Sequence, residues 1–141
     1  MKSQTIGDYD IVHALGQGAA GAVYLVRNRI SGMEYAMKLL HPEEAGKARM
    51  NDRFIREALV LKDLRHPNIV GYVDSGHVDC GDEGISYYIV MELVECGSLK
   101  SAMRNFGRFP WRTAVKVAGQ ISEGLAHAHA KGVIHRDLKP A

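Results

Sequence analysis

The sequence closes on Val133-Ile134-His135-Arg136-Asp137-Leu138-Lys139-Pro140-Ala141, where two apolar residues lead into a dense polar loop. The Asp137 carboxyl group has Arg136 before it and Lys139 two residues after it. Because nearby positive charge favours the ionised form of a carboxyl group, Asp137 is expected to be charged near neutral pH and able to accept a proton or a hydrogen bond. A surface turn after a helix could carry the same residues without any function. The upstream sequence has to decide between such a turn and a functional loop in which Asp137 accepts a proton.

Length and composition describe an ordinary globular protein. The 141 residues suit one domain, and 46% hydrophobic with 24% charged residues argue against a disordered chain or a coiled coil. The formal net charge is +2, and acidic and basic residues are interspersed without a basic block that could neutralise a run of phosphates. Nucleic acid is therefore not expected as a partner.

The sequence also indicates a cellular compartment. Residues 1–8 lack the apolar core of a signal peptide, and no apolar run has the length of a membrane span. Cys80 and Cys96 stand far apart, outside the C-x-x-C spacing of zinc sites and redox pairs. We therefore expect a cytoplasmic location, reduced thiols and no membrane contact from this segment.

A glycine-rich segment lies between two predicted strands near the start of the chain. It reads Gly16-Gln17-Gly18-Ala19-Ala20-Gly21, and strand character resumes over Ala22–Val26. A dinucleotide-binding glycine motif would lead into a helix, whereas here two strands form a hairpin. Glycines let backbone N–H groups approach phosphate oxygens closely, although a plain glycine-rich hairpin is the alternative. The residues that alternate as one face of the first strand are Tyr9, Ile11, His13 and Leu15.

Two charged residues accompany the next predicted elements. Lys38 lies inside an apolar strand predicted over Met33–Leu40, so its ammonium group needs either a partner or the solvated face of a sheet. A helix is predicted from about Met50 to Leu64, with Glu57 beside its apolar stripe. Judged on local sequence, Glu57 would be the i,i+4 partner of Arg53.

The remaining periodicity predicts two more strands and two more helices. The strands cover Gly71–Gly76 and Ser86–Glu92. Five strands with one inserted helix therefore precede the last two helices. The longer of these has an apolar stripe that needs a partner surface. The shorter helix opens with Cys96-Gly97-Ser98-Leu99, carries Leu99, Met103 and Phe106 as its apolar residues, and ends at Gly107. The longer helix covers Trp111–Lys131 and ends at Gly132.

Five of these features occur in the order found in eukaryotic-type protein kinases, and the chain resembles about the first half of their catalytic domain. Lys139, two residues after Asp137, resembles the Ser/Thr group of the family, and Lys-Pro-Ala at the end resembles bacterial members. The matching features are the glycine segment 16–21 with Val23, Tyr35-Ala36-Met37-Lys38, Glu57, the run Tyr88–Val94, and His135-Arg136-Asp137-Leu138-Lys139-Pro140.

The resemblance implies an α+β fold. It would consist of a kinase small lobe, a five-stranded antiparallel sheet plus the family's αC helix, followed by the first helices of the large lobe and truncated in the catalytic loop. It implies a division into residues 1–94, the small lobe and hinge, and residues 95–141, the incomplete start of the large lobe.

The resemblance further implies transfer of the γ-phosphate of ATP to Ser or Thr hydroxyls of protein substrates. Asp137 would accept the hydroxyl proton, and Lys139 would lie beside the γ-phosphate. Lys38, held by Glu57, would fix the α- and β-phosphates. The nucleotide-binding set would be Leu15, Gly16, Gly18, Gly21, Val23, Ala36, Lys38, Met91, Glu92 and Val94, with the backbone of the last two at the adenine edge. The Mg²⁺ ligands, an Asn and the Asp of a D-F-G motif, would lie beyond residue 141, so no metal ligand is expected in this sequence.

Two other functions remain open from the sequence. One is a nucleotide-binding or scaffolding module without catalysis, such as a pseudokinase or a truncated product. The other is a small-molecule kinase of related fold, which the complete His-Arg-Asp-Leu-Lys-Pro loop disfavours. Because the 141 residues contain neither the Asn nor a D-F-G motif, they are expected not to catalyse phosphate transfer by themselves.

Overall fold

The computed structural model of the chain describes residues 4–18, 21–40, 48–136 and 138–140. These residues form two compact units. The first comprises Met1–Asp63 with Gly71–Leu93, and the second comprises Leu64–Val70 with Val94–Ala141. The predicted division into two domains, residues 1–94 and 95–141, stays a prediction, because compact units do not by themselves define domains.

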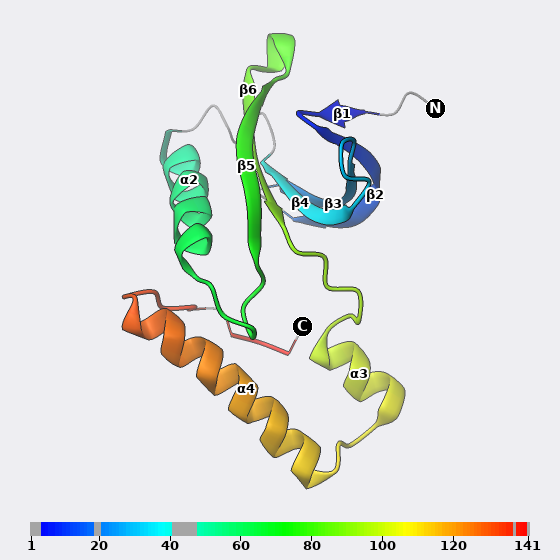
Figure 1. The fold of residues 1–141 in the computed structure, drawn as a ribbon, viewed down its shortest axis with the longest axis vertical. Helices are drawn as coiled ribbons and strands as arrows, with labels where there is room; N and C mark the ends of the chain where they lie inside the picture. The colour runs from blue at the N-terminus through cyan, green and yellow to red at the C-terminus, as the bar shows by residue number, and fades with distance from the viewer. Residues whose placement is uncertain (1–3, 19–20, 41–47, 137, 141) are drawn as a thin grey trace. The chain divides into compact units, whose positions relative to one another are not determined.

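The first unit is built on an antiparallel sheet in the order β1-β2-β3-β4-β6-β5, with helix α2 beside β5 and β6 (Figure 1). Helix α2 covers Ala48–Asp63, and the short 3₁₀ turn η1 at Gly81–Glu83 joins β5 to β6. This arrangement is the predicted one, an antiparallel sheet with one inserted helix. The strands are β1 (Thr5–Ile6), β2 (Tyr9–Gly18), β3 (Gly21–Asn28), β4 (Glu34–Leu40), β5 (Tyr72–Asp79) and β6 (Ile85–Met91).

The sheet differs from the predicted one in strand number and strand length. Strand β1 is a sixth strand of only two residues, too short to show an alternating pattern in the sequence. Strand β5 was predicted to end at Gly76 but continues to Asp79, which pairs with Ile85. A Cβ atom at Gly76 would lie 2.6 Å from the Tyr88 hydroxyl oxygen, so this glycine leaves space for a buried tyrosine and does not end the strand.

Irregular pairing breaks the predicted face of β2. The register between β2 and β3 shifts twice, between Ile11 and His13 and between Ala14 and Gly16. A bulge changes the side of the sheet to which the following residues point. Tyr9, which precedes both shifts, is buried, whereas His13 and Leu15, which follow the first shift, are exposed and do not continue its face.

Two apolar clusters cover the two faces of the sheet. The cluster on one face contains Val26, Met37 and Val90, each fully buried. The cluster on the other face joins Leu40 and Ile89 of the sheet to Phe54 and Ala58 of α2. Because residues alternate along β4, the second face also carries Ala36 and Lys38. Helix α2 and the predicted phosphate-binding lysine therefore share one face of the sheet.

Tyr9 makes the first unit sensitive to alkaline pH. Burial and the nearby Asp74 carboxylate raise the pKa of Tyr9 from 10.0 to about 12, and its hydroxyl lies 3.3 Å from Asp74 Oδ2. The unfolded chain therefore loses this proton at a lower pH than the folded chain. We expect the free energy of unfolding to be insensitive to Tyr9 below about pH 10 and to fall by roughly 2 to 3 kcal/mol between about pH 10 and 12.

The test compares urea unfolding of the wild type and Tyr9→Phe at neutral and alkaline pH. The variant loses the hydrogen bond to Asp74 and should be less stable at neutral pH, by about 1 kcal/mol. Its further decline at alkaline pH should be smaller than that of the wild type. Parallel declines in the two proteins would show that Tyr9 does not keep its proton in the folded state.

The second unit contains helices α3 (Leu99–Phe106) and α4 (Trp111–Ala130), close to their predicted bounds (Figure 1). Ser98 and Ser101 form a reciprocal capping box at the start of α3. Gly107 follows α3 with a φ of 73°, and Gly132 lies just beyond α4 with a φ of 74°. The left-handed backbone after each helix explains why glycine stands at these two predicted ends.

The loop between α2 and β5 packs on α4. Asn68 Nδ2 donates to Glu123 Oε2 at 3.1 Å, and the rings of His66 and His127 lie 5.1 Å apart. A Cβ atom on Gly124 would lie 3.1 Å from the Asn68 carbonyl oxygen, so glycine permits this close approach.

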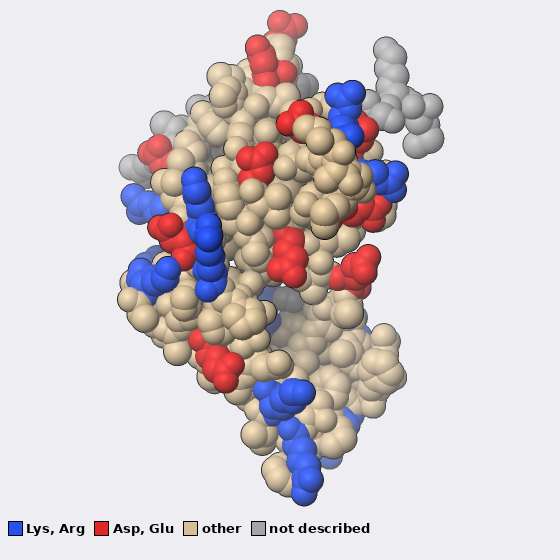
Figure 2. All heavy atoms as spheres, in the orientation of Figure 1, with Lys and Arg blue, Asp and Glu red and all other residues tan. Residues whose placement is uncertain are grey.

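No described helix combines the length and the apolar character needed to cross a membrane. On the face drawn in Figure 2, acidic and basic side chains are both scattered over the surface.

Candidate active site

An ion pair between Lys38 and Glu57 joins the sheet to α2. Lys38 Nζ lies 2.6 Å from Glu57 Oε1 and 2.8 Å from Oε2, so the contact engages both carboxylate oxygens. The side chains remain 33% and 43% exposed. The Phe54 ring centroid lies 5.6 Å from the same Nζ and flanks it on the helix side. The structure thus gives the lysine inside an apolar strand the partner that it requires, and this partner is Glu57.

The strand register places the predicted nucleotide-binding side chains together. Lys38 lies opposite Val23 on β3 and opposite Ile89 on β6. Ala36, two residues earlier on the same face, lies opposite Met91. Val23, Ala36, Lys38 and Met91 therefore share one face, an apolar surface that ends at the ammonium group. Leu15 lies in the irregular part of β2 and is 47% exposed.

The three predicted phosphate-loop glycines differ in their surroundings. A Cβ atom at Gly21 would lie 2.2 Å from the Leu39 carbonyl oxygen, whereas nothing lies within 4 Å of one at Gly16. At Gly18 the nearest atom would be the Gly21 carbonyl oxygen, at 3.7 Å. Packing against β4 therefore requires Gly21. Gly16 and Gly18 leave the backbone of the hairpin accessible, while Ala19 and Ala20 at its tip lie outside the described residues.

This contrast predicts different effects of alanine at two glycines of one hairpin. Gly21→Ala should lower the free energy of unfolding by roughly 1 to 3 kcal/mol or more, because backbone atoms of β4 must move. Gly16→Ala is the matched control and should change it by about 0.5 kcal/mol or less. Urea unfolding followed by circular dichroism measures both. Equal losses of stability in the two variants would contradict the close approach of β3 and β4 at Gly21.

The segment after β6 carries the two predicted adenine-binding residues. The Glu92 backbone N–H donates to the Gly71 carbonyl oxygen at 2.8 Å, and Glu92 Oε2 accepts from the Gly71 N–H at 3.2 Å. Both interactions lie within the first unit. A contact from the Glu92 backbone to a ligand would therefore come from its carbonyl oxygen. Val94 begins the second unit and is 58% exposed.

The polar loop at the end of the chain lies in the second unit. Asp137, the predicted proton acceptor, lies outside the described residues. Arg136 before it has a φ of 61°, a left-handed backbone that costs a non-glycine residue of the order of 1 kcal/mol. Lys139 is exposed, and the Pro140 carbonyl oxygen accepts a hydrogen bond from the Lys100 N–H at 2.8 Å. The strained arginine is a feature that the sequence did not indicate.

The sheet, the pair of Lys38 and Glu57 and the terminal loop lie in a chain that matches a known protein family. The family model described as "Protein kinase domain" matches residues 9–141. The chain belongs to the protein kinase domain family. This confirms the resemblance drawn from the sequence.

Relatives of this kinase domain include bacterial and fungal proteins. The chain is 40% identical over 134 residues to serine/threonine-protein kinase pkn2 of Myxococcus xanthus, covering 95% of this chain and 15% of that protein. It is 38% identical over 134 residues to serine/threonine-protein kinase PrkC of Bacillus subtilis, covering 95% and 20%. It is 34% identical over 139 residues to an Aurora kinase of Yarrowia lipolytica, covering 99% and 36%. The chain thus spans well under half the length of these relatives.

A solved structure confirms the kinase fold. The crystal structure of the Mycobacterium tuberculosis PknI kinase domain, C20A mutant, matches with a TM-score of 0.78 and 30% sequence identity. The match covers 100% of this chain and 56% of that chain. The sheet with α2 is accordingly the small-lobe arrangement of protein kinases.

The kinase family implies magnesium beside ATP. Mg²⁺ takes oxygen ligands, mainly carboxylates and waters. Among the described residues, no three His, Cys, Asp or Glu side chains are grouped so that they could hold a metal ion.

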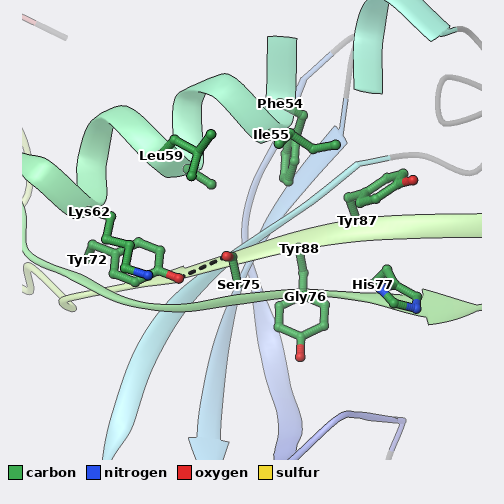
Figure 3. Close-up of a pocket in the computed structure, with 11 residues that line it drawn as sticks. Phe54, Ile55, Leu59, Lys62, Tyr72, Ser75, Gly76, His77, Tyr87 and Tyr88 are labelled. Atoms are coloured by element: carbon green, nitrogen blue, oxygen red, sulfur yellow. Dashed lines mark hydrogen bonds between the residues drawn. The ribbon is translucent and has the colours of Figure 1, made fainter. Parts of the chain in front are cut away.

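The kinase domain also has a cavity of about 230 Å³ between α2 and the neighbouring strands β5 and β6 (Figure 3). Ile55 and Leu59 line it, although they are 42% and 60% exposed. Tyr72 and Ser75 hydroxyls lie 2.9 Å apart at its edge. The predictions from the sequence did not include this cavity. Its signal was the apolar i,i+4 pair Ile55 and Leu59, which lies off the stripe that faces the core.

Proposed function

We propose that this kinase domain takes part in transfer of the γ-phosphate of ATP to Ser or Thr hydroxyls of protein substrates, in a protein that carries a complete kinase domain. The observation that carries the proposal is the contact of 2.6 Å between Lys38 and Glu57 on the face shared with Val23, Ala36 and Met91. An ammonium group held at the edge of an apolar surface suits a ligand with a flat apolar ring and a phosphate chain.

Lys38 and Glu57 have complementary tasks in this proposal. The Lys38 ammonium donates hydrogen bonds to oxygens of the α- and β-phosphates, and charge-assisted hydrogen bonds are stronger than neutral ones. Glu57 limits the rotamers of the lysine, because both carboxylate oxygens lie within 2.8 Å of Nζ. Fixing the donor group in advance lowers the entropy cost of reaching the transition state. Glu57 is thus a positioning residue.

The adenine ring would contact Val23, Ala36 and Met91. The Glu92 carbonyl oxygen would accept from the amino group of adenine, since the Glu92 N–H is used by Gly71. Gly16 and Gly18 would let backbone N–H groups approach the phosphates, because neither residue carries a Cβ atom and the described residues leave the space beside each uncrowded. The other proposed contacts come from Leu15, Gly21 and Val94.

The residues of the terminal loop would handle the acceptor hydroxyl. The hydroxyl oxygen attacks the γ-phosphorus, the bond from phosphorus to the β–γ bridging oxygen breaks, and ADP leaves. Asp137 accepts the hydroxyl proton, while Lys139 donates to the transferring phosphoryl oxygens. Magnesium, when bound, neutralises charge on the β- and γ-phosphates. Lys139 at this position, together with the names of the relatives, supports Ser and Thr as acceptors.

The proposal is tested by assaying transfer of radiolabel from ATP to a mixed protein substrate, with a form of the protein that includes a complete kinase domain. Acid hydrolysis of the product should yield labelled phosphoserine and phosphothreonine. The 141 residues alone serve as a control and should transfer no label. Nucleotide binding without transfer by the complete domain would instead support a binding or scaffolding module, and labelled phosphotyrosine alone would contradict the acceptor class.

A further inference from the structure

A hollow lined by three cationic side chains lies in the second unit. Its volume is about 520 Å³, and its lining residues are Lys100, Met103 and Arg104 of α3 with Lys139 and Pro140 of the terminal loop. All five side chains belong to the same unit and are exposed. Three positive charges around one hollow favour an anionic occupant.

The stability of α3 does not account for Lys100, whereas the helix dipole favours Arg104 in the last turn. The two residues are four apart, and like charges at this spacing destabilise a helix. Lys100 also lies in the first turn, where the helix dipole disfavours a cation, and the first turn contains no acidic residue. Within the described part of the chain, neither Lys100 nor Arg104 forms an ion pair. A role outside the helix therefore accounts for Lys100 better than a role within it, and Arg104 lines the same hollow.

The hollow lies beside the residues proposed for catalysis. The Lys100 N–H donates to the Pro140 carbonyl oxygen at 2.8 Å, which ties the start of α3 to the terminal loop. Lys139 follows Asp137 by two residues, a chain length that spans at most about 7 Å. An extended peptide advances about 3.3 Å per residue. A side chain within about four residues of a Ser or Thr bound at Asp137 can therefore reach this hollow.

We propose that Lys100 and Arg104 at this hollow bind an acidic side chain of the protein substrate, so that the kinase prefers Ser or Thr flanked by Asp, Glu or a phosphorylated residue. This inference rests on the proposed function. Lys100 and Arg104 supply the charge that selects the anion, and Met103 and Pro140 supply an apolar surface for its methylene groups. Charge complementarity of this kind fixes which peptides bind and in which register.

The first experiment measures kcat/KM for a peptide series in a form of the protein that includes a complete kinase domain. Each position flanking the acceptor carries in turn Glu, phosphoserine, Ala or Lys. The variant is K100E/R104E, and the control is R112E/K116E, which reverses two exposed cations at the same spacing on α4. We expect K100E/R104E to lose roughly tenfold on acidic peptides while the Ala peptide is unaffected. The control should retain the preference.

Several results of the peptide series would overturn the inference. No acidic preference in the wild type would do so. Loss of the preference in both variants, or in neither, would show that the hollow does not select the anion. The Glu and phosphoserine arms identify which anion is preferred, and either preference supports the inference when K100E/R104E abolishes it.

The second experiment separates this inference from the proposed function. Fluorescence anisotropy measures the affinity of a labelled acidic peptide for the same three proteins without any transfer. Binding should weaken roughly tenfold in K100E/R104E and should weaken with added salt, since exposed charges are screened over about 10 Å at 0.1 M. The wild type could transfer no phosphate and still bind the acidic peptide more tightly than K100E/R104E does. In that case the proposed function fails, but the inference that the hollow binds an acidic side chain is supported. Equal affinities for all three proteins would overturn the inference even in an active kinase.

Discussion

Replacing Asp137 by Asn is expected to lower the rate of phosphate transfer by about 10²-fold or more, because the amide cannot accept the proton of the substrate hydroxyl. The side chains have nearly the same size, so folding and ATP affinity should change little. The measurement is kcat for a Ser peptide at saturating ATP, in a form of the protein that includes a complete kinase domain.

A second substitution controls for the loss of a negative charge. Asp82→Asn makes the same chemical change at an exposed site in η1, and its kcat should equal that of the wild type. Melting temperatures of the two variants should agree with the wild type. If Asp137→Asn transfers phosphate as fast as Asp82→Asn, Asp137 is not the proton acceptor, and the role drawn from the family resemblance is wrong.

The sequence predicted most elements of the fold because local chemistry decides them. Gly107 and Gly132 follow helices whose ends require a left-handed residue, and positive φ angles are found at both. Alternation and glycine position predicted the hairpin of β2 and β3. The pattern failed at Gly76, where a glycine makes room for Tyr88, a residue of another strand. Local periodicity does not predict contacts between distant segments.

In the candidate site, too, contacts between distant segments could not be predicted from local sequence. Local sequence favoured Arg53, whose side chain lies outside the described part of the structure, as the partner of Glu57. The structure places Glu57 against Lys38, 19 residues earlier. Only the resemblance to kinases pointed to this contact, since no local rule connects a strand lysine with a helix glutamate. The register that sets Ala36 opposite Met91 likewise depends on pairing between β4 and β6, which are separated by α2 and β5.

Lys38→Met is expected to reduce kcat/KM for ATP-dependent transfer by about 10²-fold or more, since the substitution removes a preorganised positive charge from the phosphates. The methionine keeps much of the apolar stem, and Glu57 is 43% exposed, so its carboxylate can be hydrated after the loss of its partner. The fold should therefore persist. Lys116→Met, on the exposed surface of α4, is the matched control and should retain full activity.

Glu57→Gln distinguishes a positioning role from an independent one. If Glu57 acts only by holding Lys38, its loss matters only while the lysine is present. The single variant Glu57→Gln should then be slower than the wild type, but Lys38→Met with Glu57→Gln should be no slower than Lys38→Met alone. A double-mutant cycle on kcat/KM measures this coupling. Effects that simply multiply in the double variant would mean that Glu57 contributes to transfer by a route other than the 2.6 Å contact with Lys38.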